Sequence, residues 1–305
     1  MYDDLRPDRF HLERTNVRGF GQAFVREGVG GVPLLLVHGW PETKRIWWRN
    51  IEPLAAAGFE VIAPDLRGFG DSDVGPDRFH DVPSHSRDIE ALLRELGHEH
   101  VVAVAGDLGG PVIQDLSLRF PGLIERMVLF NSPLPFDKER MAGMRTRPPR
   151  ESSDYFLRQG TDADALAAEL ATAGERRRYI ATFYTSRFWG HPGAFSPEAV
   201  DFMTEPFADA AKLRASLGAY ESSFNASARS EPSTMASPNP TRTVILFGTS
   251  DHVLYPEYDR MAAVVFPNHV GPYLLRDCGH FVQWEAAEIV NNTVAAFCAD
   301  LLARR

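Results

Sequence analysis

The chain of 305 residues contains little cysteine, with only Cys278 and Cys298. Two cysteines that far apart do not have the spacing of a zinc site, and they give no disulfide framework of the kind found in small secreted proteins. We therefore expect two reduced thiols in the core of a cytoplasmic protein, and neither a metal ion nor another cofactor.

Positive charge is also scarce. The chain has 32 lysine and arginine residues against 41 aspartate and glutamate residues, which gives a net charge of −9. Binding to phosphate groups requires a cationic surface, so the balance excludes nucleic acid and anionic membrane as expected partners. The one dense basic cluster, at 176–178, is explained by the solvated face of a helix.

Long hydrophobic runs are missing as well. A membrane-spanning helix needs about 18 consecutive apolar residues, and the longest runs, such as VPLLLV at 32–37, are far shorter. The first residues, MYDDLRPDRFHLER, are acidic and mixed in charge, unlike a secretory signal. We expect no stable membrane insertion, and the sequence leaves a homodimer open.

What the chain does have is a regular alternation of short apolar runs with amphipathic stretches. A hairpin strand is expected within 18–30, and helices are expected from Thr43 to Gly58 and from Asp88 to Leu96. The alternation predicts an α/β fold with a mostly parallel sheet and helices on both faces. The runs that are typical of buried strands lie at 32–37, 59–64, 101–105, 126–131, 241–248 and 271–277.

The strand pattern stops near Pro133 and resumes after the Ser- and Pro-rich stretch at 227–240. Between about 137 and 225 the periodicity is helical only. We therefore expect a core domain formed by residues 1–133 and 240–305, and a helical cap domain formed by residues 134–239.

Three polar residues each follow the carboxyl end of a predicted strand. Asp107 follows VVAVA, Asp251 follows TVILFG, and His280 follows YLLRDCG. Ligands bind at this edge of an open α/β sheet, and the order nucleophile, acid, histidine is that of the α/β-hydrolase triads. These three residues are the predicted catalytic triad.

The turn that carries Asp107 has the composition of a nucleophile elbow, a sharp strand-to-helix turn with small neighbours. Ala105 and Gly109 lie two residues before and after it, and the chain contains no Gly-x-Ser-x-Gly. An aspartate that only caps the following helix is the alternative. The register with Asp251 and His280 favours a nucleophile.

A second element is the sequence His38-Gly39-Trp40-Pro41 directly after the strand at 32–37. The backbone N–H groups of Trp40 and Leu108 are predicted to form an oxyanion hole. We expect the aromatic side chains of Trp40, Phe281, Phe188 and Trp189 to line a pocket for a small apolar substrate, although aromatic side chains also fill cores.

An aspartate nucleophile implies a different reaction from a serine. A carboxylate with an ordinary pKa of about 3.9 is ionised at neutral pH and can attack an sp³ carbon that carries a leaving group. The product is an alkyl ester of Asp107. Water activated by His280, which Asp251 orients, then hydrolyses this ester without a cofactor.

Five motifs now make a family resemblance specific: HGWPE at 38–42, DLRGFGDSD at 65–73, GDLGG at 106–110, SDH at 250–252 and GHF at 279–281. Over nearly its whole length the chain resembles the epoxide hydrolases of the α/β-hydrolase fold. The resemblance implies an epoxide substrate that is opened to a vicinal diol. It also implies two proton-donating tyrosines in the cap, which match Tyr155 and Tyr220 by position, although Glu221 stands where the family usually has arginine.

Two alternatives remain. The core motifs are shared with haloalkane and haloacetate dehalogenases, but Leu108 replaces the tryptophan that holds halide in the first group. The arginines that clamp a carboxylate in the second group are missing, and Asn131 stands where those enzymes place their acid. A binding protein that has the fold without turnover is the other alternative, and the complete triad argues against it.

Overall fold

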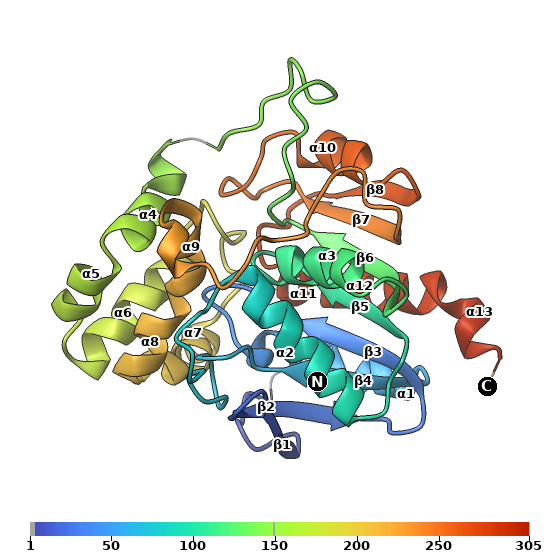
Figure 1. Ribbon diagram of the computed structural model, residues 1–305, viewed down its shortest axis with the longest axis horizontal. Helices are drawn as coiled ribbons and strands as arrows, with labels where there is room; N and C mark the ends of the chain where they lie inside the picture. Colours follow the sequence, from blue (N-terminus) through green and yellow to red (C-terminus); the bar gives the residue numbers. More distant parts are fainter. Residues whose placement is uncertain (1–3, 149, 305) are drawn as a thin grey trace.

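The computed structural model describes residues 4–148 and 150–304, and these residues form an eight-stranded sheet with helices around it (Figure 1). The strand order across the sheet is β1-β2-β4-β3-β5-β6-β7-β8. The strands are β1 (Leu12–Val17), β2 (Phe20–Glu27), β3 (Val32–Val37), β4 (Phe59–Pro64), β5 (Val101–Ala105), β6 (Ile124–Phe130), β7 (Arg242–Gly248) and β8 (His269–Leu275).

The sheet is parallel from β4 to β8, while β1 and β2 pair in antiparallel fashion and β2 is antiparallel to β4. Every residue of β4 and β5 is buried, as expected for strands that helices cover on both faces. The predicted α/β fold is therefore confirmed. The early hairpin contains two strands where the sequence predicted one, because the predicted run begins at the Arg18–Gly19 turn and the first strand, β1, lies before it.

Helices α2 and α3 pack together on one face of the sheet, and α1 and α12 contact each other on the other face (Figure 1). The predicted helix from Asp88 in fact begins at Val82, because the Asp81 carboxylate accepts a hydrogen bond from the Ser84 N–H and caps the helix there. The core helices are α1 (Ile51–Ala56), α2 (Val82–Glu95), α3 (Gly109–Arg119), α10 (Tyr258–Val265), α11 (Val282–Glu285), α12 (Ala287–Phe297) and α13 (Ala299–Leu302).

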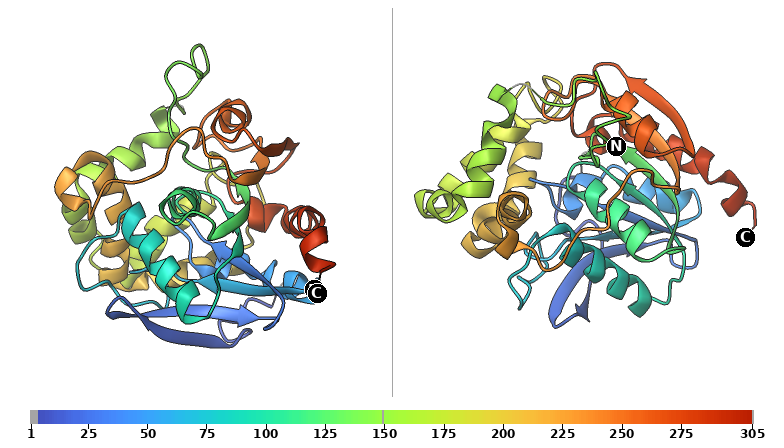
Figure 2. Two further views of the ribbon diagram at one scale, coloured as in Figure 1. Left: turned by 45° about the vertical axis from the view of Figure 1, so that its right-hand side comes forward. Right: turned by 45° about the horizontal axis from the view of Figure 1, so that its top comes forward.

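Between β6 and β7 the described chain forms helices and loops only, and these helices gather beside the sheet in every view (Figures 1 and 2). The returning stretch at 227–240 is tied to the core by charge. Arg119 on α3 binds both Asp115 and Glu231, at 2.8 Å each. The helices are α4 (Arg150–Thr161), α5 (Ala163–Glu169), α6 (Ala173–Tyr184), α7 (Pro197–Thr204), α8 (Ala210–Ser216) and α9 (Gly218–Phe224).

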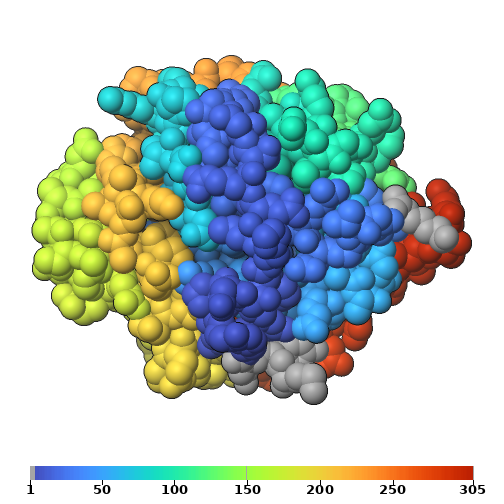
Figure 3. Space-filling model, turned by 90° about the horizontal axis from the view of Figure 1, so that it is seen from below, coloured from blue at the N-terminus to red at the C-terminus, as the bar shows by residue number. Residues whose placement is uncertain are grey.

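A view of the molecular surface shows which segments of the chain lie side by side. Seen from below, the N-terminal strands β1 and β2 lie between the helices of the β6–β7 connection on one side and the C-terminal end of the chain on the other (Figure 3). Within the described ranges, no helix has both the length and the apolar character that crossing a bilayer demands.

Candidate active site

The three predicted triad residues meet at the carboxyl edge of the sheet, although they come from three different strand ends. The Nδ1 atom of His280 lies 2.8 Å from Oδ2 of Asp251, and its Nε2 atom lies 3.2 Å from Oδ2 of Asp107. All three side chains are buried. The histidine therefore stands between two carboxylates, one on each ring nitrogen.

The turn at Asp107 is strained in the way that an elbow requires. Asp107 has a φ of +40°, a left-handed conformation that costs a non-glycine residue about 1–3 kcal/mol. Its backbone N–H donates to the Asn131 carbonyl at 2.9 Å, which anchors the turn to the end of β6. A side chain at Gly109 would place its Cβ 2.5 Å from the Val37 carbonyl oxygen, so the turn also needs a small residue there.

The two oxygens of the Asp107 carboxylate have different surroundings. Oδ1 accepts a hydrogen bond of 2.6 Å from the Trp40 N–H, whereas Oδ2 faces His280. The contact between Oδ2 and Nε2 is not aligned as a hydrogen bond, so Nε2 is buried without a hydrogen-bond partner among the described residues. The Leu108 N–H lies on the same turn, and its part in an oxyanion hole stays a prediction.

Asp251 is held by a dense set of donors. Its Oδ1 accepts from the Val253 N–H at 2.6 Å and the Leu254 N–H at 3.2 Å. Its Oδ2 accepts from the Asn131 side-chain amide at 2.8 Å in addition to His280. Asn131 thus supports the acid of the triad, a role that the sequence analysis missed even though Asn131 follows a predicted strand as the triad residues do.

The electrostatics of the site follow from these contacts. Burial alone would lower the pKa of His280, but the two carboxylates beside it raise that pKa well above its ordinary value. Burial raises the pKa values of Tyr155 and Tyr220 well above the ordinary phenol value, and the charge of Asp107 raises them further. Both tyrosines are therefore protonated at neutral pH and can donate a hydrogen bond.

An aromatic cluster lies over Asp107. The Trp40 ring stacks on Tyr155 at 5.9 Å between centroids and meets Tyr220 edge to face at 5.3 Å. Tyr155 comes from α4 and Tyr220 from α9, and their rings lie 5.9 Å apart. The structure thus brings both predicted tyrosines together near Asp107.

The other predicted pocket residues divide into two groups. Trp189 belongs to the cluster, since its ring lies 4.6 Å from His280 and 5.2 Å from Tyr155. Phe281 is fully buried, and its ring stacks on both Tyr184 and Trp189, so it packs beneath the cluster. Phe188 packs, partly buried, against the hydrophobic core, and the aromatic and cationic neighbours of its ring are His252 and the Arg187 guanidinium.

Glu42 is a further buried group near the triad that the sequence analysis quoted only as part of a motif. Its carboxylate accepts from the Gly39 N–H at 2.6 Å and from the Gln283 amide at 2.9 Å. Burial, together with the charge of Asp107, raises its pKa to about 7. Glu42 therefore changes its charge close to neutral pH.

We expect the Glu42→Gln variant to be the more stable one at pH 8. In the wild-type chain the folded state binds the Glu42 proton more tightly than the unfolded state does, because the pKa rises from 4.5 to about 7 on folding. Its unfolding free energy therefore falls as the pH rises from about 4.5 to 7, by at most about 3 kcal/mol.

The neutral glutamine removes this fall, and it can donate to the Gln283 side-chain oxygen, which has no partner in the described structure. Urea unfolding of both variants between pH 5 and pH 8 measures the difference. A difference in unfolding free energy that stays constant over this range contradicts the prediction.

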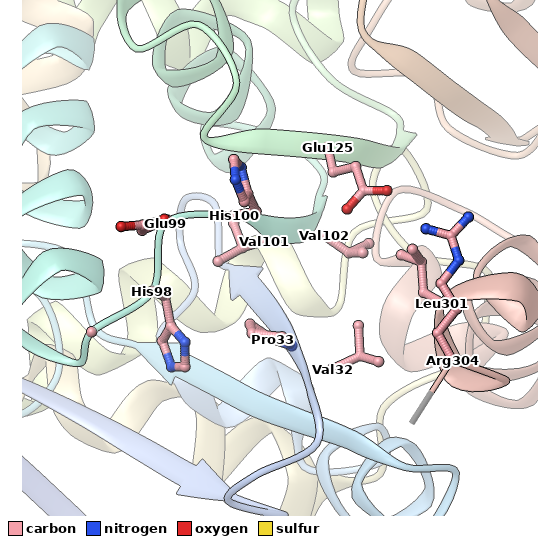
Figure 4. Close-up of a pocket in the computed structure, with 11 residues that line it drawn as sticks. Val32, Pro33, His98, Glu99, His100, Val101, Val102, Glu125, Leu301 and Arg304 are labelled. Carbon is pink, nitrogen blue, oxygen red and sulfur yellow. The ribbon is translucent and has the colours of Figure 1, made fainter.

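A separate surface depression lies away from this site, at the amino-terminal end of the parallel strands (Figure 4). Its walls include Val32 and Pro33 at the start of β3, Val101 and Val102 at the start of β5, and Arg304. None of the triad residues lines it, so it is not the candidate active site. In residues 4–148 and 150–304, no group of three or more His, Cys, Asp and Glu side chains is arranged to hold a metal ion.

The chain was compared with known proteins. The family described as alpha/beta hydrolase fold matches residues 32–287. The soluble epoxide hydrolase of Corynebacterium sp. (strain C12) is 27% identical over 290 residues, which cover 93% of this chain and 96% of that protein. The epoxide hydrolase of Caballeronia sordidicola is 26% identical over 297 residues, covering 90% and 89% of the two chains.

A similar solved structure agrees on the fold. The structure described as epoxide hydrolase CorEH without ligand has a TM-score of 0.82 and 24% sequence identity, and the match covers 96% of this chain and all of that one. At 24% sequence identity, this likeness shows that the two proteins share a fold and shows nothing more.

Proposed function

Since the chain belongs to the alpha/beta hydrolase fold family, we propose that it is an epoxide hydrolase that opens an epoxide to a vicinal diol through an alkyl ester of Asp107. The observation that carries the proposal is the Asp107 carboxylate itself. One of its oxygens is held by the Trp40 N–H and the other faces Nε2 of His280, and two protonated tyrosines lie nearby. The names of the relatives from Corynebacterium and Caballeronia support the same substrate class.

In the first half-reaction, Oδ2 of Asp107 attacks an epoxide carbon and the C–O bond of the ring breaks. The oxygen that leaves takes a proton from the tyrosine pair, Tyr155 and Tyr220. This step needs a proton donor that is protonated before the reaction begins. Both tyrosines meet this need, because their pKa values are raised well above the ordinary phenol value. The result is an ester of Asp107, a hydroxyl group on the substrate and one ionised tyrosine.

In the second half-reaction, His280 takes a proton from water, and the hydroxide attacks the carboxyl carbon of the ester. The Trp40 N–H already binds Oδ1, which becomes the oxyanion, and we assign the Leu108 N–H as the second donor. The diol then leaves with a proton from His280. The proton of the regenerated Asp107 carboxyl returns to the ionised tyrosine, so the net reaction consumes one water.

Ester formation also prepares the base. The negative charge of Asp107 is one cause of the raised pKa of His280, and an ester carries no charge. The pKa of His280 therefore falls when the intermediate forms, so a proton that the ring holds in the free enzyme passes to solvent and returns after the ester is hydrolysed. The neutral ring can then accept a proton from water. The Asp251 carboxylate beside Nδ1 stabilises the imidazolium that results.

The surroundings favour an apolar epoxide over a halogenated substrate. Trp40, Tyr155 and Trp189 offer aromatic surface next to the nucleophile. Halide release would need N–H donors free to hold the ion. The indole N–H of Trp40 is already bound to the Ser216 hydroxyl at 3.1 Å, and the side chain after the nucleophile is Leu108.

We also propose that residues 134–239 act as a cap on a core formed by residues 1–133 and 240–305. Two observations support this division. The cap supplies Tyr155 and Tyr220, the groups that assist the leaving oxygen, whereas the core supplies the triad. Ser216 of the cap accepts the Trp40 indole hydrogen bond, which fixes the cap helix α8 against the core turn at 38–41.

The decisive experiment is a single turnover of a simple aryl epoxide in water labelled with ¹⁸O, with enzyme in excess. The ester mechanism takes the first diol oxygen from Asp107, so the first diol formed is unlabelled and the label enters the Asp107 carboxylate. Mass spectrometry of the diol and of the peptide that contains Asp107 measures both. Label in the first diol means that water attacks the epoxide directly, and it excludes Asp107 as the nucleophile.

A further inference from the structure

Glu285 is a carboxylate close to the triad that no step of the proposed reaction uses. It lies at the end of α11, five residues after His280, and it is partly buried. Its carboxylate accepts three hydrogen bonds, all of them from backbone N–H groups. Because all three donors are backbone groups, Glu285 holds segments of the main chain in place.

Two of these bonds fix the loop of the catalytic base. Oε2 of Glu285 accepts from the Gly279 N–H at 2.8 Å, and Oε1 accepts from the Phe281 N–H at 3.1 Å. The donors are the residues directly before and after His280. The peptide groups on both sides of the base are therefore bound to one carboxylate, which restricts how the imidazole can turn.

The third bond reaches the helical segment between β6 and β7. The His191 N–H, in the loop between α6 and α7, donates to Oε2 of Glu285 at 2.9 Å. The same loop accepts a bond of 2.6 Å from the His280 N–H at the Trp189 carbonyl, and one of 2.9 Å from the His252 N–H at the Phe188 carbonyl. The loop thus contacts the backbone beside both the acid and the base of the triad.

The approach of the two loops is close enough to require glycine. A Cβ atom at Gly279 would lie 2.4 Å from the Trp189 carbonyl oxygen and 2.8 Å from the His191 nitrogen. The loops therefore pack backbone against backbone, with Glu285 binding to both. This packing places the Trp189 ring 4.6 Å from the His280 ring.

We propose that Glu285 is a positioning residue that holds the backbone on both sides of His280 against the loop at 186–191. The orientation of the His280 ring then depends on the position of that loop. The proposal rests on the proposed function, because it concerns the step in which His280 activates water. Ester formation depends on Asp107, Tyr155 and Tyr220, which Glu285 does not contact in the described structure. Glu285 therefore serves the second half-reaction selectively.

The Glu285→Gln variant tests this selectivity. The amide keeps the size of the side chain, but its NH₂ group cannot accept a hydrogen bond, so at least one backbone N–H loses its partner. We expect hydrolysis of the ester to slow by about 10- to 100-fold, the usual effect of a small misplacement, while ester formation changes little. Rapid-quench kinetics with intact mass measures both rates, and the ester accumulates in the steady state.

The matched control is Asp115→Asn. Asp115 is also a buried carboxylate that accepts a backbone N–H from a distant segment, that of Thr234, but it lies away from the base. We expect this variant to lose stability without a change in the ratio of the two rates. If both half-reactions of Glu285→Gln slow by the same factor, or neither slows, the positioning role is wrong.

A second measurement needs no substrate and separates the two proposals. Hydrogen exchange of the backbone is expected to rise in Glu285→Ala, which removes all three acceptor bonds, in two separate segments, 186–191 and 277–281, compared with wild type. Unchanged exchange in the first segment overturns the coupling. If wild type forms no ester with any epoxide, the proposed function fails, and the exchange result still decides whether Glu285 couples the two loops.

Discussion

Replacing His280 with glutamine is expected to stop the reaction after its first half and to leave Asp107 as a stable alkyl ester. Asp107 keeps the Trp40 N–H on Oδ1, and both tyrosines stay in place, so the nucleophile can still open an epoxide. The ester then has no base to activate water. Losses of this kind in triads reach about 10⁴-fold or more in turnover. Intact mass after incubation with an aryl epoxide should show the protein plus one substrate molecule.

Two further variants make this result specific. Asp107→Asn has no nucleophilic oxygen anion, so it should gain no mass and turn over no epoxide. His100→Gln is a matched control, since His100 is exposed and lines the depression at the opposite edge of the sheet. It should behave as wild type. Retained turnover in His280→Gln, or an adduct that survives in Asp107→Asn, would refute the assigned roles.

The meeting of the Asp107, Asp251 and His280 side chains could be predicted from the sequence because it is a property of the sheet. Asp107, Asp251 and His280 each follow an apolar run, and parallel strands bring their carboxyl ends to one edge. Local sequence patterns are therefore enough to predict that these residues, which are far apart in the chain, lie close together in the fold. The alternation of strands and helices gave the fold class for the same reason.

The residues that support the triad could not be predicted in this way. Glu42 and Glu285 bind backbone N–H groups, which look alike in every sequence, and Asn131 binds the Asp251 carboxylate 120 residues away in the chain. Their partners are known only when the loops have been placed. Phe188 illustrates the converse, since its neighbour Trp189 joins the aromatic cluster while the Phe188 ring lies against His252.

The residues at which helices begin and end also depend on tertiary contacts, which the spacing of apolar residues does not reveal. The stretch after Thr43 contains a short 3-10 helix, Lys44–Trp47, and then α1, whereas one helix was predicted. Lys44 at the start of this stretch binds the buried Asp65 through both its backbone N–H and its side chain. That tertiary contact fixes where the chain turns. A helix predicted from apolar spacing alone has no information about such a partner.

The double variant Tyr155→Phe with Tyr220→Phe is expected to lose epoxide opening, the first half-reaction, by about 10²- to 10⁴-fold. The leaving oxygen of an epoxide becomes an alkoxide unless a proton reaches it. The rings of these two phenols lie 5.9 Å apart near Asp107, and burial keeps them protonated. Each single variant should lose less than the double one, because the remaining hydroxyl can still donate. Single-turnover formation of the ester measures the effect.

The leaving group gives this prediction its control. Bromide needs no proton to depart, so any slow reaction with an alkyl bromide should be spared in the double variant. Tyr179→Phe is the matched residue control, since Tyr179 comes from the same helical segment and its hydroxyl is bound to Gln159 at 2.9 Å. It should keep the wild-type rate of ester formation. If the double variant opens epoxides at the wild-type rate, the proton comes from elsewhere, and neither tyrosine has a role in the reaction.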